Sequence, residues 1–418
     1  MQNTNPSAQS DIRHIFSLDY GELLKEGVSM RNAGFFHEAE IALLATTRLR
    51  PAEWQPKYEL GALYLSQKEP RKAVVYLEEA FALNQGEPRL VERLASCHTV
   101  LGNFSNAEEI LRRALLTDYH AVTAIAENAQ YVEYVRAYPI EYAQSVHQEI
   151  TEKSGPFLSA QDVFQRIVQS IENRQPFSLV RLGDGEGTWL HRVAHEEALF
   201  GTLYERNRKE FWNIWFGKDK AENIPYFYRA TEQICNELSK VDVLGIPPMS
   251  WIAHEYATGN LRGTSGTLNA CRVANRFAGP GTSFCSQLIH YELDRKDMLR
   301  KILRGKEVVG AVSCHPGISD YIRHELGVQN VIYIPLPGEP SRRHLLGEES
   351  VHGEHFPERF EEILKDIEGK DYSGMIFLVA GGILGKLYTL RLRQSGAVAL
   401  DIGSTADRWM NKKTRPGF

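Results

Sequence analysis

The chain has 418 residues, 43% hydrophobic and 24% charged, a composition that excludes a fibrous or largely disordered protein. Its formal net charge of −5 at pH 7 argues against a protein that binds nucleic acid through a broad basic face. The five cysteines include no Cys-x-x-Cys pair, so neither a disulfide framework nor a zinc ribbon is indicated, and we expect a cytoplasmic protein.

Residues 1–19 begin with a polar, uncharged run and are predicted to form a flexible N-terminus. The run lacks the basic and apolar parts of a signal peptide. No stretch of the sequence approaches the ~18–20 apolar residues of a membrane-spanning helix, so we expect no transmembrane segment.

A repeat with a period of 34 residues follows. Small or apolar residues recur in one register, in the sets Gly27, Gly61 and Ala95; Ala39, Ala73 and Ala107; Leu43, Leu77 and Leu111; and Thr46, Ala80 and Ala114. Small residues suit places where two paired helices approach closely. Gly34 and Gly102 fall at the turn between paired helices, where a positive φ is expected, and the middle copy has Lys68 there.

This pattern resembles the tetratricopeptide repeat, with three copies over residues 20–121. The resemblance implies stacked helix pairs, which serve either as a structural or dimerisation surface or as a groove for a protein partner or acceptor chain. Three repeats are the usual minimum for a stable stack. Residues 122–157 are predicted to be a helical cap or linker, ended by the breaker Lys153-Ser154-Gly155-Pro156.

Residues 158–418 are predicted to form a Rossmann-like α/β domain with a mainly parallel sheet. A helix start at Ser159–Asp162 leads into the first of six apolar, largely β-branched runs, which are 177–182, 241–246, 307–312, 330–334, 375–380 and 397–401. Helical segments at 319–326 and 356–367 lie between them. Such alternation favours helices on both faces of a sheet, with sites at the carboxyl ends of the strands.

One cluster of acids directly follows the first predicted strand, in Arg181-Leu182-Gly183-Asp184-Gly185-Glu186. Two carboxylates two residues apart repel each other unless a positive group lies between them, and Mg²⁺ or Mn²⁺ with a diphosphate suits this role. Arg181 is a candidate phosphate ligand. The alternative is a tight glycine turn with a solvated Asp.

Two further clusters lie between a strand and a helix. Ser313 and His315 are candidate anion contacts, or part of a capped helix start. Gly382 and Lys386 belong to a glycine-rich turn that lacks the full phosphate-loop pattern. Two interpretations of this turn remain: close packing of the strand against the helix, or a weak anion nest that includes Lys386.

A third segment, 260–267, combines small hydroxyl residues with Arg262 and is interpreted as a binding loop. It leads towards His290 and Glu292, which are candidate bases or metal ligands. The aromatic run 211–216 is a candidate sugar platform, although such runs are more often core.

The catalytic half resembles the GT-D glycosyltransferases over residues 177–409. The resemblance rests on the early Arg-x-Gly-Asp-Gly-Glu motif, the glycine loop at Gly382 and Gly385, and the late segment 400–404. It implies metal-dependent transfer of a sugar, often UDP-linked, to a glycan or glycoprotein. By position, Asp184 and Glu186 carry the family's Asp-x-Glu pair. Where the family often has His after its final Asp-x-Gly, this chain has Ser404.

The sequence therefore predicts a Mn²⁺- or Mg²⁺-dependent glycosyltransferase that uses a nucleotide-sugar donor. Asp184 and Glu186 are the expected metal ligands, with donor contacts from Arg181, Gly183, Gly185, Ser313, His315, Gly382 and Lys386. Glu292 or Asp401 is the expected acceptor-side base. The alternatives are a methyltransferase, a phosphotransferase, or a non-catalytic scaffold that captures a partner through the repeats.

Overall fold

The computed structural model describes residues 18–117, 122–217, 221–259 and 261–414. Two compact units divide the chain: the first comprises Met1–Pro139 with His254–Asn260, and the second comprises Ile140–Ala253 with Leu261–Phe418. Of the predicted flexible segment 1–19, only the last two residues are described. Within the described ranges, no helix is both long and apolar enough to cross a membrane.

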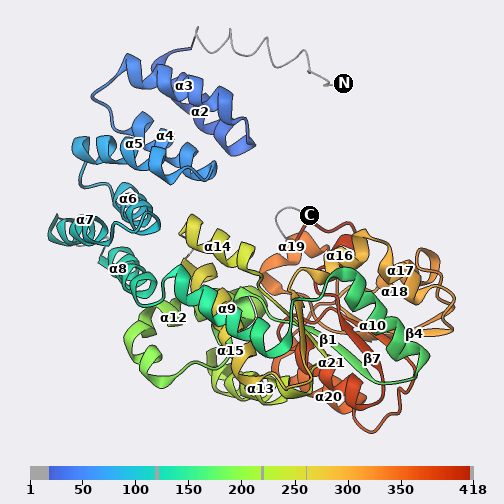
Figure 1. Cartoon of the computed structure of the whole chain (residues 1–418). Helices are drawn as coiled ribbons and strands as arrows, with labels where there is room; N and C mark the ends of the chain where they lie inside the picture. The colour runs from blue at the N-terminus through green and yellow to red at the C-terminus, as the bar shows by residue number, and fades with distance from the viewer. Residues whose placement is uncertain (1–17, 118–121, 218–220, 260, 415–418) are drawn as a thin grey trace. The chain divides into compact units, whose positions relative to one another are not determined.

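The first unit is a series of paired helices, as the 34-residue period predicts. They are α2 (Tyr20–Ala33), α3 (Phe36–Leu49), α4 (Gln55–Ser66), α5 (Pro70–Leu83), α6 (Pro88–Val100), α7 (Phe104–Thr117) and α8 (Val122–Ala137). Each pair is followed by the next along the chain (Figure 1). A Cβ added to Gly27 would lie 2.9 Å from Leu43, and one added to Gly61 would lie 2.6 Å from Leu77, which explains the small residue at this register.

The turn inside each pair needs a left-handed residue. Gly34 and Gly102 have φ of 85° and 75°, and Lys68 adopts the same conformation with φ of 62°. The glycines that the sequence places at these turns therefore have the positive φ expected of them.

Two further segments help to define the limits of the first unit: the end of α14 and the segment 122–157. The end of α14 (Met249–Thr258) also belongs to it. There the hydroxyl of Tyr256 donates to the carbonyl of Tyr138 at 2.7 Å. The segment predicted as a cap or linker forms two helices, α8 in the first unit and α9 (Ile140–Ser154) in the second.

In the second unit, the described residues form one seven-stranded parallel sheet in the order β3-β2-β1-β7-β6-β4-β5. Its strands are β1 (Phe177–Arg181), β2 (Val243–Ile246), β3 (Ser283–Ser286), β4 (Val308–Ser313), β5 (Asn330–Pro335), β6 (Ile376–Val379) and β7 (Val398–Asp401). The predicted parallel α/β fold is therefore confirmed. Only β3 is absent from the predicted strands, because Ser-Phe-Cys-Ser is short and lacks a β-branched run.

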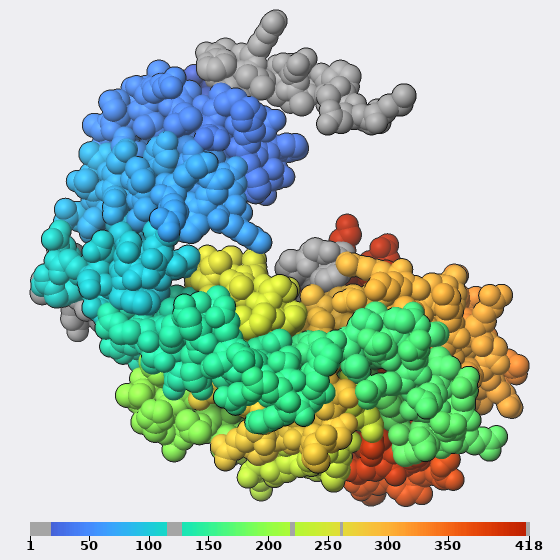
Figure 2. All heavy atoms as spheres, viewed as in Figure 1, coloured from blue at the N-terminus to red at the C-terminus, as the bar shows by residue number. Residues whose placement is uncertain are grey.

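Helices surround this sheet. They are α10 (Ala160–Glu172), α11 (Asp184–Trp189), α12 (Ala194–Trp215), α13 (Ile224–Glu237), α15 (Leu261–Phe277), α16 (Ile289–Arg295), α17 (Met298–Leu303), α18 (Ile318–His324), α19 (Arg343–Leu346), α20 (Phe360–Ile367), α21 (Gly385–Gln394) and α22 (Thr405–Trp409). Short 3-10 or π turns lie at Ala221–Asn223, Leu238–Lys240, Pro340–Arg342 and His355–Arg359. Helices α9 and α10 lie at the surface of this unit in Figure 2.

Two helix predictions can be compared with the structure. Ser159 caps α10 in a reciprocal capping box with Asp162, as its sequence suggests. The binding loop predicted at 260–267 is wrong from Leu261 onward, because those residues begin α15. A Cβ on Gly266 would lie 2.2 Å from the carbonyl oxygen of Asp184, so the small residues serve close packing of α15 against α11.

Candidate functional site

The candidate site lies where β1 and β7 end side by side in the sheet. From β1 the chain adds β2 and β3 on one side, and the remaining strands lie on the other side of β1. The strand order therefore reverses at the β1–β7 pair. In open parallel sheets, ligands bind outside the carboxyl ends of the strands at such a switch point.

Arg181 at the end of β1 and Asp401 at the end of β7 form a buried ion pair. Nη2 of Arg181 donates to Oδ1 of Asp401 at 2.9 Å, and Nε donates to the carbonyl of Asp401 at 3.1 Å. The chain then turns at Gly403, which has a φ of 45°. A Cβ at Gly403 would lie 2.0 Å from Nη2 of Arg181, so glycine is needed for the guanidinium to reach its partner.

Lys386, on the first turn of α21, joins Asp401 to the acidic motif after β1. Its Nζ lies 2.7 Å from Oδ2 of Asp401 and 3.1 Å from Oε1 of Glu186, and only 3% of its side chain is exposed. The other carboxylate oxygen of Glu186 accepts the backbone N–H of Gly183 at 2.9 Å. Arg181, Asp401, Lys386 and Glu186 thus alternate in charge, and we call these four residues the charge network.

The network holds both of its acids in the ionised form. Burial alone raises the pKa of Asp401, but Arg181 and Lys386 outweigh it and keep the pKa below its ordinary value. Burial also raises the pKa of Glu186, and Lys386 together with the Gly183 N–H outweighs it. Two cations therefore stabilise the Asp401 carboxylate, which makes it a weaker proton acceptor in this arrangement.

His290 on α16 lies against the network. Its Nδ1 is 3.0 Å from Nη1 of Arg181, which also donates to the carbonyl of Gln287 at 3.0 Å. Burial, then Arg181 and Lys386, hold the pKa of His290 well below its usual range. A neutral imidazole can accept the Arg181 hydrogen bond, so we interpret His290 as a buried support for the guanidinium.

Asp184 differs from its neighbour Glu186. It begins α11, is partly exposed, and has no ion pair among the described residues. Burial and the charge of Glu186 raise its pKa, while Arg262 opposes this shift. Arg262 itself pairs with Glu210 at 3.2 Å. Asp184 is therefore the acid of the Asp-x-Glu pair that remains available for a cationic ligand.

This arrangement bears on the predicted metal. The positive group expected between the two acids is supplied to Glu186 by Lys386, and both oxygens of Glu186 are engaged. Glu186 therefore does not fit as a direct ligand in this arrangement. Asp184 does fit as an oxygen donor for Mg²⁺ or Mn²⁺, which both prefer carboxylates.

The glycines of the motif allow close packing. A Cβ at Gly185 would lie 2.9 Å from Trp215 and 3.0 Å from Phe211, so aromatic residues of α12 close over this turn. Gly183 is also tight, because a Cβ there would lie 3.2 Å from the side chains of both Glu186 and Gln287. Gly382, in the turn after β6, has a φ of 57°.

Three other predicted residues lie outside the charge network. Ser313 is buried, and its hydroxyl accepts the backbone N–H of His315 at 3.2 Å. Nε2 of His315 lies 2.8 Å from Oδ1 of Asp407. Glu292 has a 44% exposed side chain and lies 3.7 Å from Lys296. Because residues two apart on a helix face different directions, Glu292 does not share the buried side of α16 with His290.

Some contacts had no sequence signal. The carbonyl of Gln287 holds Arg181, and any residue type supplies a carbonyl. The hydroxyl of Tyr291 lies 2.5 Å from that of Ser404, the residue that stands where the GT-D resemblance suggests His. Asp407 follows the last predicted strand by six residues, and only the fold brings it to His315.

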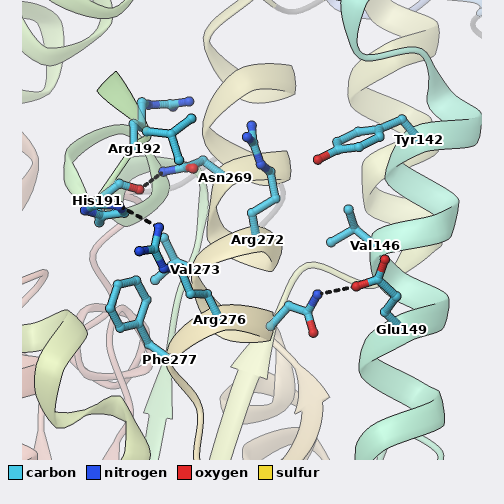
Figure 3. A pocket seen from close by; sticks show the side chains of 12 residues that line it. Tyr142, Val146, Glu149, His191, Arg192, Asn269, Arg272, Val273, Arg276 and Phe277 are labelled. Atoms are coloured by element: carbon cyan, nitrogen blue, oxygen red, sulfur yellow. Dashed lines mark hydrogen bonds between the residues drawn. The ribbon is translucent and has the colours of Figure 1, made fainter. Parts of the chain in front are cut away.

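A separate cavity of about 220 Å³ lies between α9 and α15 (Figure 3). Its wall includes Tyr142, Arg272 and Phe277. Arg276 lies 2.9 Å from Nε2 of His191 there. None of the predicted site residues lines this cavity, so it is separate from the candidate site.

Comparison with known families agrees with the two-part organisation. Residues 158–338 match the model of the GT-D fold-like domain, and residues 64–126 match a tetratricopeptide repeat model. The chain therefore contains a GT-D-like domain preceded by tetratricopeptide repeats, as the sequence predicts. The matched part of the GT-D-like domain includes β1 to β5 and the Asp-x-Glu motif, whereas Lys386 and Asp401 lie beyond it.

Individual relatives add little to this comparison. No curated protein matches the chain. Among solved structures, the chain is similar to a mutant of the O-GlcNAc transferase from Thermobaculum terrenum, with 12% identity and a TM-score of 0.26. That match covers 92% of this chain and 75% of the other. A TM-score this low carries no information about the site.

Proposed function

We propose that the chain is a glycosyltransferase that moves a sugar from a nucleotide-diphosphate donor, with a UDP-sugar favoured, to a glycan or glycoprotein acceptor. The observation that carries this proposal is the charge network at the switch point of a GT-D-like domain, with Asp184 beside it. In open parallel sheets, ligands bind at this carboxyl edge.

Charge counting supports a divalent cation in this reaction. Arg181 and Lys386 balance Asp401 and Glu186, so the network is neutral and Asp184 adds one negative charge. A diphosphate at this edge would meet no excess positive charge within these five residues. A Mn²⁺ or Mg²⁺ ion held by Asp184 and by the diphosphate would supply it and would stabilise the departing nucleoside diphosphate.

The network acts in this proposal as a rigid support. It ties the ends of β1 and β7 to α21 and fixes the turn from which Asp184 projects. Of the two predicted bases, Asp401 would have to leave two cations before it accepted a proton. Glu292 has a 44% exposed side chain and lies outside the charge network, so we propose it rather than Asp401 as the acceptor-side base.

The repeats have a proposed role of their own. Tetratricopeptide-type arrays present extended surfaces to partners. We propose that the repeat unit recruits the acceptor or a protein partner.

The test is isothermal titration of the full chain with UDP, GDP and ADP, each with and without Mn²⁺. We expect Mn²⁺-dependent binding of one diphosphate. Asp184→Asn should weaken it about tenfold or more, because a contact to a charged group contributes roughly 1.5–3 kcal/mol. Asp320→Asn is the matched control, since its carboxylate lies on α18 and is 69% exposed.

Other outcomes would favour other functions. Metal-independent binding of S-adenosylmethionine would favour a methyltransferase, and turnover of ATP a phosphotransferase. Failure to bind any nucleotide would favour a scaffold that works through its repeats. Equal Mn²⁺-dependent affinity in Asp184→Asn and the unchanged chain would remove Asp184 from the donor site.

A further inference from the structure

A second cluster of chemically active side chains lies at the end of β4. Cys314 and His315 directly follow this strand, and Asp407 comes from α22, 92 residues beyond His315. One ligand atom from each residue, a thiol sulfur, an imidazole nitrogen and a carboxylate oxygen, lies within 4.8 Å of the other two. Within the described ranges, no other group of three or more His, Cys, Asp or Glu side chains meets this geometry.

These donors match the chemistry of zinc. Zn²⁺ binds thiolate sulfur at about 2.3 Å, and imidazole nitrogen and carboxylate oxygen at about 2.0–2.2 Å, in tetrahedral geometry. Two nitrogen or oxygen ligands of one such ion therefore lie roughly 3.3 Å apart. Nε2 of His315 and Oδ1 of Asp407 are 2.8 Å apart, so this pair would open by about half an ångström when the ion binds between them.

The surroundings hold the three residues in place. The backbone carbonyl of Cys314 accepts the N–H of Val351 at 2.8 Å, and the backbone N–H of His315 donates to Ser313. The second oxygen of Asp407 accepts the hydroxyl of Thr414 at 2.5 Å. Hydrogen bonds to the groups that carry the ligands are a usual feature of metal sites, because they fix the ligand orientation.

Burial and charge also suit a cation. Cys314 and His315 are 7% and 2% exposed, whereas the side chain of Asp407 is 16% exposed and offers an entry path. Asp407 and Glu339 place negative charge near the Cys314 thiol. The same negative field attracts a metal ion, which displaces the thiol proton to solvent when it binds.

We propose that Cys314, His315 and Asp407 form a Zn²⁺ site that ties α22 to the end of β4. The ion takes one ligand from each residue, which leaves the fourth tetrahedral position open to water or to a further ligand. The site is separate from the charge network: none of its three ligands belongs to that network.

The test is zinc binding by the full chain after removal of metal with a chelator. We expect one equivalent of Zn²⁺ by titration against a chromophoric chelator. With Co²⁺ in its place, we expect the charge-transfer absorption of a cobalt–thiolate bond. Cys314→Ser should abolish that absorption and weaken Zn²⁺ binding more than tenfold, and Asp407→Asn should weaken binding while it keeps the thiolate band.

Two controls make the result specific. Cys271→Ser removes another fully buried thiol, on α15, and should keep both the zinc equivalent and the cobalt band. Asp184→Asn should also keep them, which separates this site from the donor-side metal. Circular dichroism identifies any variant that fails to fold, and Asp407→Asn then tests the site without loss of the thiol. Absence of a stoichiometric zinc ion in the unchanged chain, or equal zinc affinity in Cys314→Ser and Cys271→Ser, overturns the proposal and leaves a His–Asp hydrogen bond beside an inert thiol.

Discussion

The repeat unit and the α/β unit differ in how far apart along the chain their contacting residues lie. In the repeats, Gly27 packs on Leu43 and Gly61 on Leu77, and both pairs are 16 residues apart. In the α/β unit, Arg181 reaches Asp401 across 220 residues. Short-range contacts leave a period in the sequence, whereas contacts between distant strands leave none. Stability of the repeats is therefore spread over many similar local contacts, and stability around the site depends on a few long-range ones.

The largest expected effect comes from the centre of the charge network. Lys386→Met should destabilise the α/β unit by about 3–5 kcal/mol, because it leaves the buried carboxylates of Asp401 and Glu186 without their shared cation. Urea unfolding followed by tryptophan fluorescence measures this change. Five of the six tryptophans belong to the α/β unit, so the signal reports mainly on it.

The control for that variant is an exposed ion pair. The side chains of Lys296 and Glu292 are 55% and 44% exposed, so Lys296→Met should change stability by less than about 1 kcal/mol. Equal losses in the two variants would mean that Lys386 has no special place in the fold.

Low pH should destabilise the α/β unit more than the repeat unit. The folded-state pKa values of Asp401 and Glu186 are lowered, so the stability that they contribute is present above their unfolded values of about 4 and is lost as the pH falls through the folded values. In the repeats, the carboxylate of Glu109 pairs with Arg112 and Arg113 at the surface, where pairing contributes little.

Hydrogen exchange of the full chain at a series of pH values measures this difference. After correction for intrinsic rates, peptides from 376–401 should lose protection at a higher pH than peptides from 104–117, which contain Glu109. The reverse order would contradict the view that buried long-range ion pairs make the α/β unit acid-sensitive.

The sequence predicts more of the repeat unit than of the α/β unit, because short-range contacts leave a pattern in the sequence and long-range contacts do not. The 34-residue period predicts the helix pairs, and apolar runs predict six of the seven strands. The sequence gives no sign of β3, because its polar Ser283 and Ser286 carry no strand signal, or of α15, because its glycines and hydroxyls favour a loop.

The same limit applies to the site. Arg181, Glu186, Lys386 and Asp401 are all candidates from the sequence. Their pairing is not predictable in this way, because local composition does not determine the strand order that brings β7 beside β1. The sequence therefore identifies the members of the charge network but not the contacts between them.

Glycines at helix contacts in the two units should also differ in how well they tolerate substitution by alanine. A Cβ at Gly187 would lie 1.8 Å from the backbone oxygen of Gly266, which cannot move without shifting α15. Gly187→Ala should cost about 1–3 kcal/mol in urea unfolding. A Cβ at Gly61 would lie 2.6 Å from a side-chain atom of Leu77 and 3.3 Å from the backbone oxygen of Ala73, and the third repeat already has Ala95 in this register. Gly61→Ala should therefore cost less, and a larger loss for Gly61→Ala would refute this ranking.

The repeat turns offer a stabilising change. Lys68 has a φ of 62°, a conformation that costs a residue with a Cβ roughly 1–2 kcal/mol. Lys68→Gly should gain up to about 1 kcal/mol, since the greater freedom of glycine in the unfolded chain offsets part of the benefit. Gly34→Ala, at the same position of the first pair, is the opposite change and should destabilise. Hydrogen exchange of peptides from α4 and α5 measures the gain, and decreased protection there would contradict the prediction.

The smallest expected effect separates a carboxylate that serves a ligand from one that serves the fold. Burial and Glu186 raise the pKa of Asp184, so its ionised form destabilises the folded chain at neutral pH. Asp184→Asn should leave stability within about 0.5 kcal/mol of the unchanged chain or raise it slightly. Asp401→Asn should lower the stability by several times this 0.5 kcal/mol limit, because Arg181 and Lys386 would lose a buried partner. Urea unfolding of the two variants at pH 7 and pH 5 compares them directly. A large loss in Asp184→Asn would assign that carboxylate to the fold, and its position beside the network would then no longer support a role in donor binding.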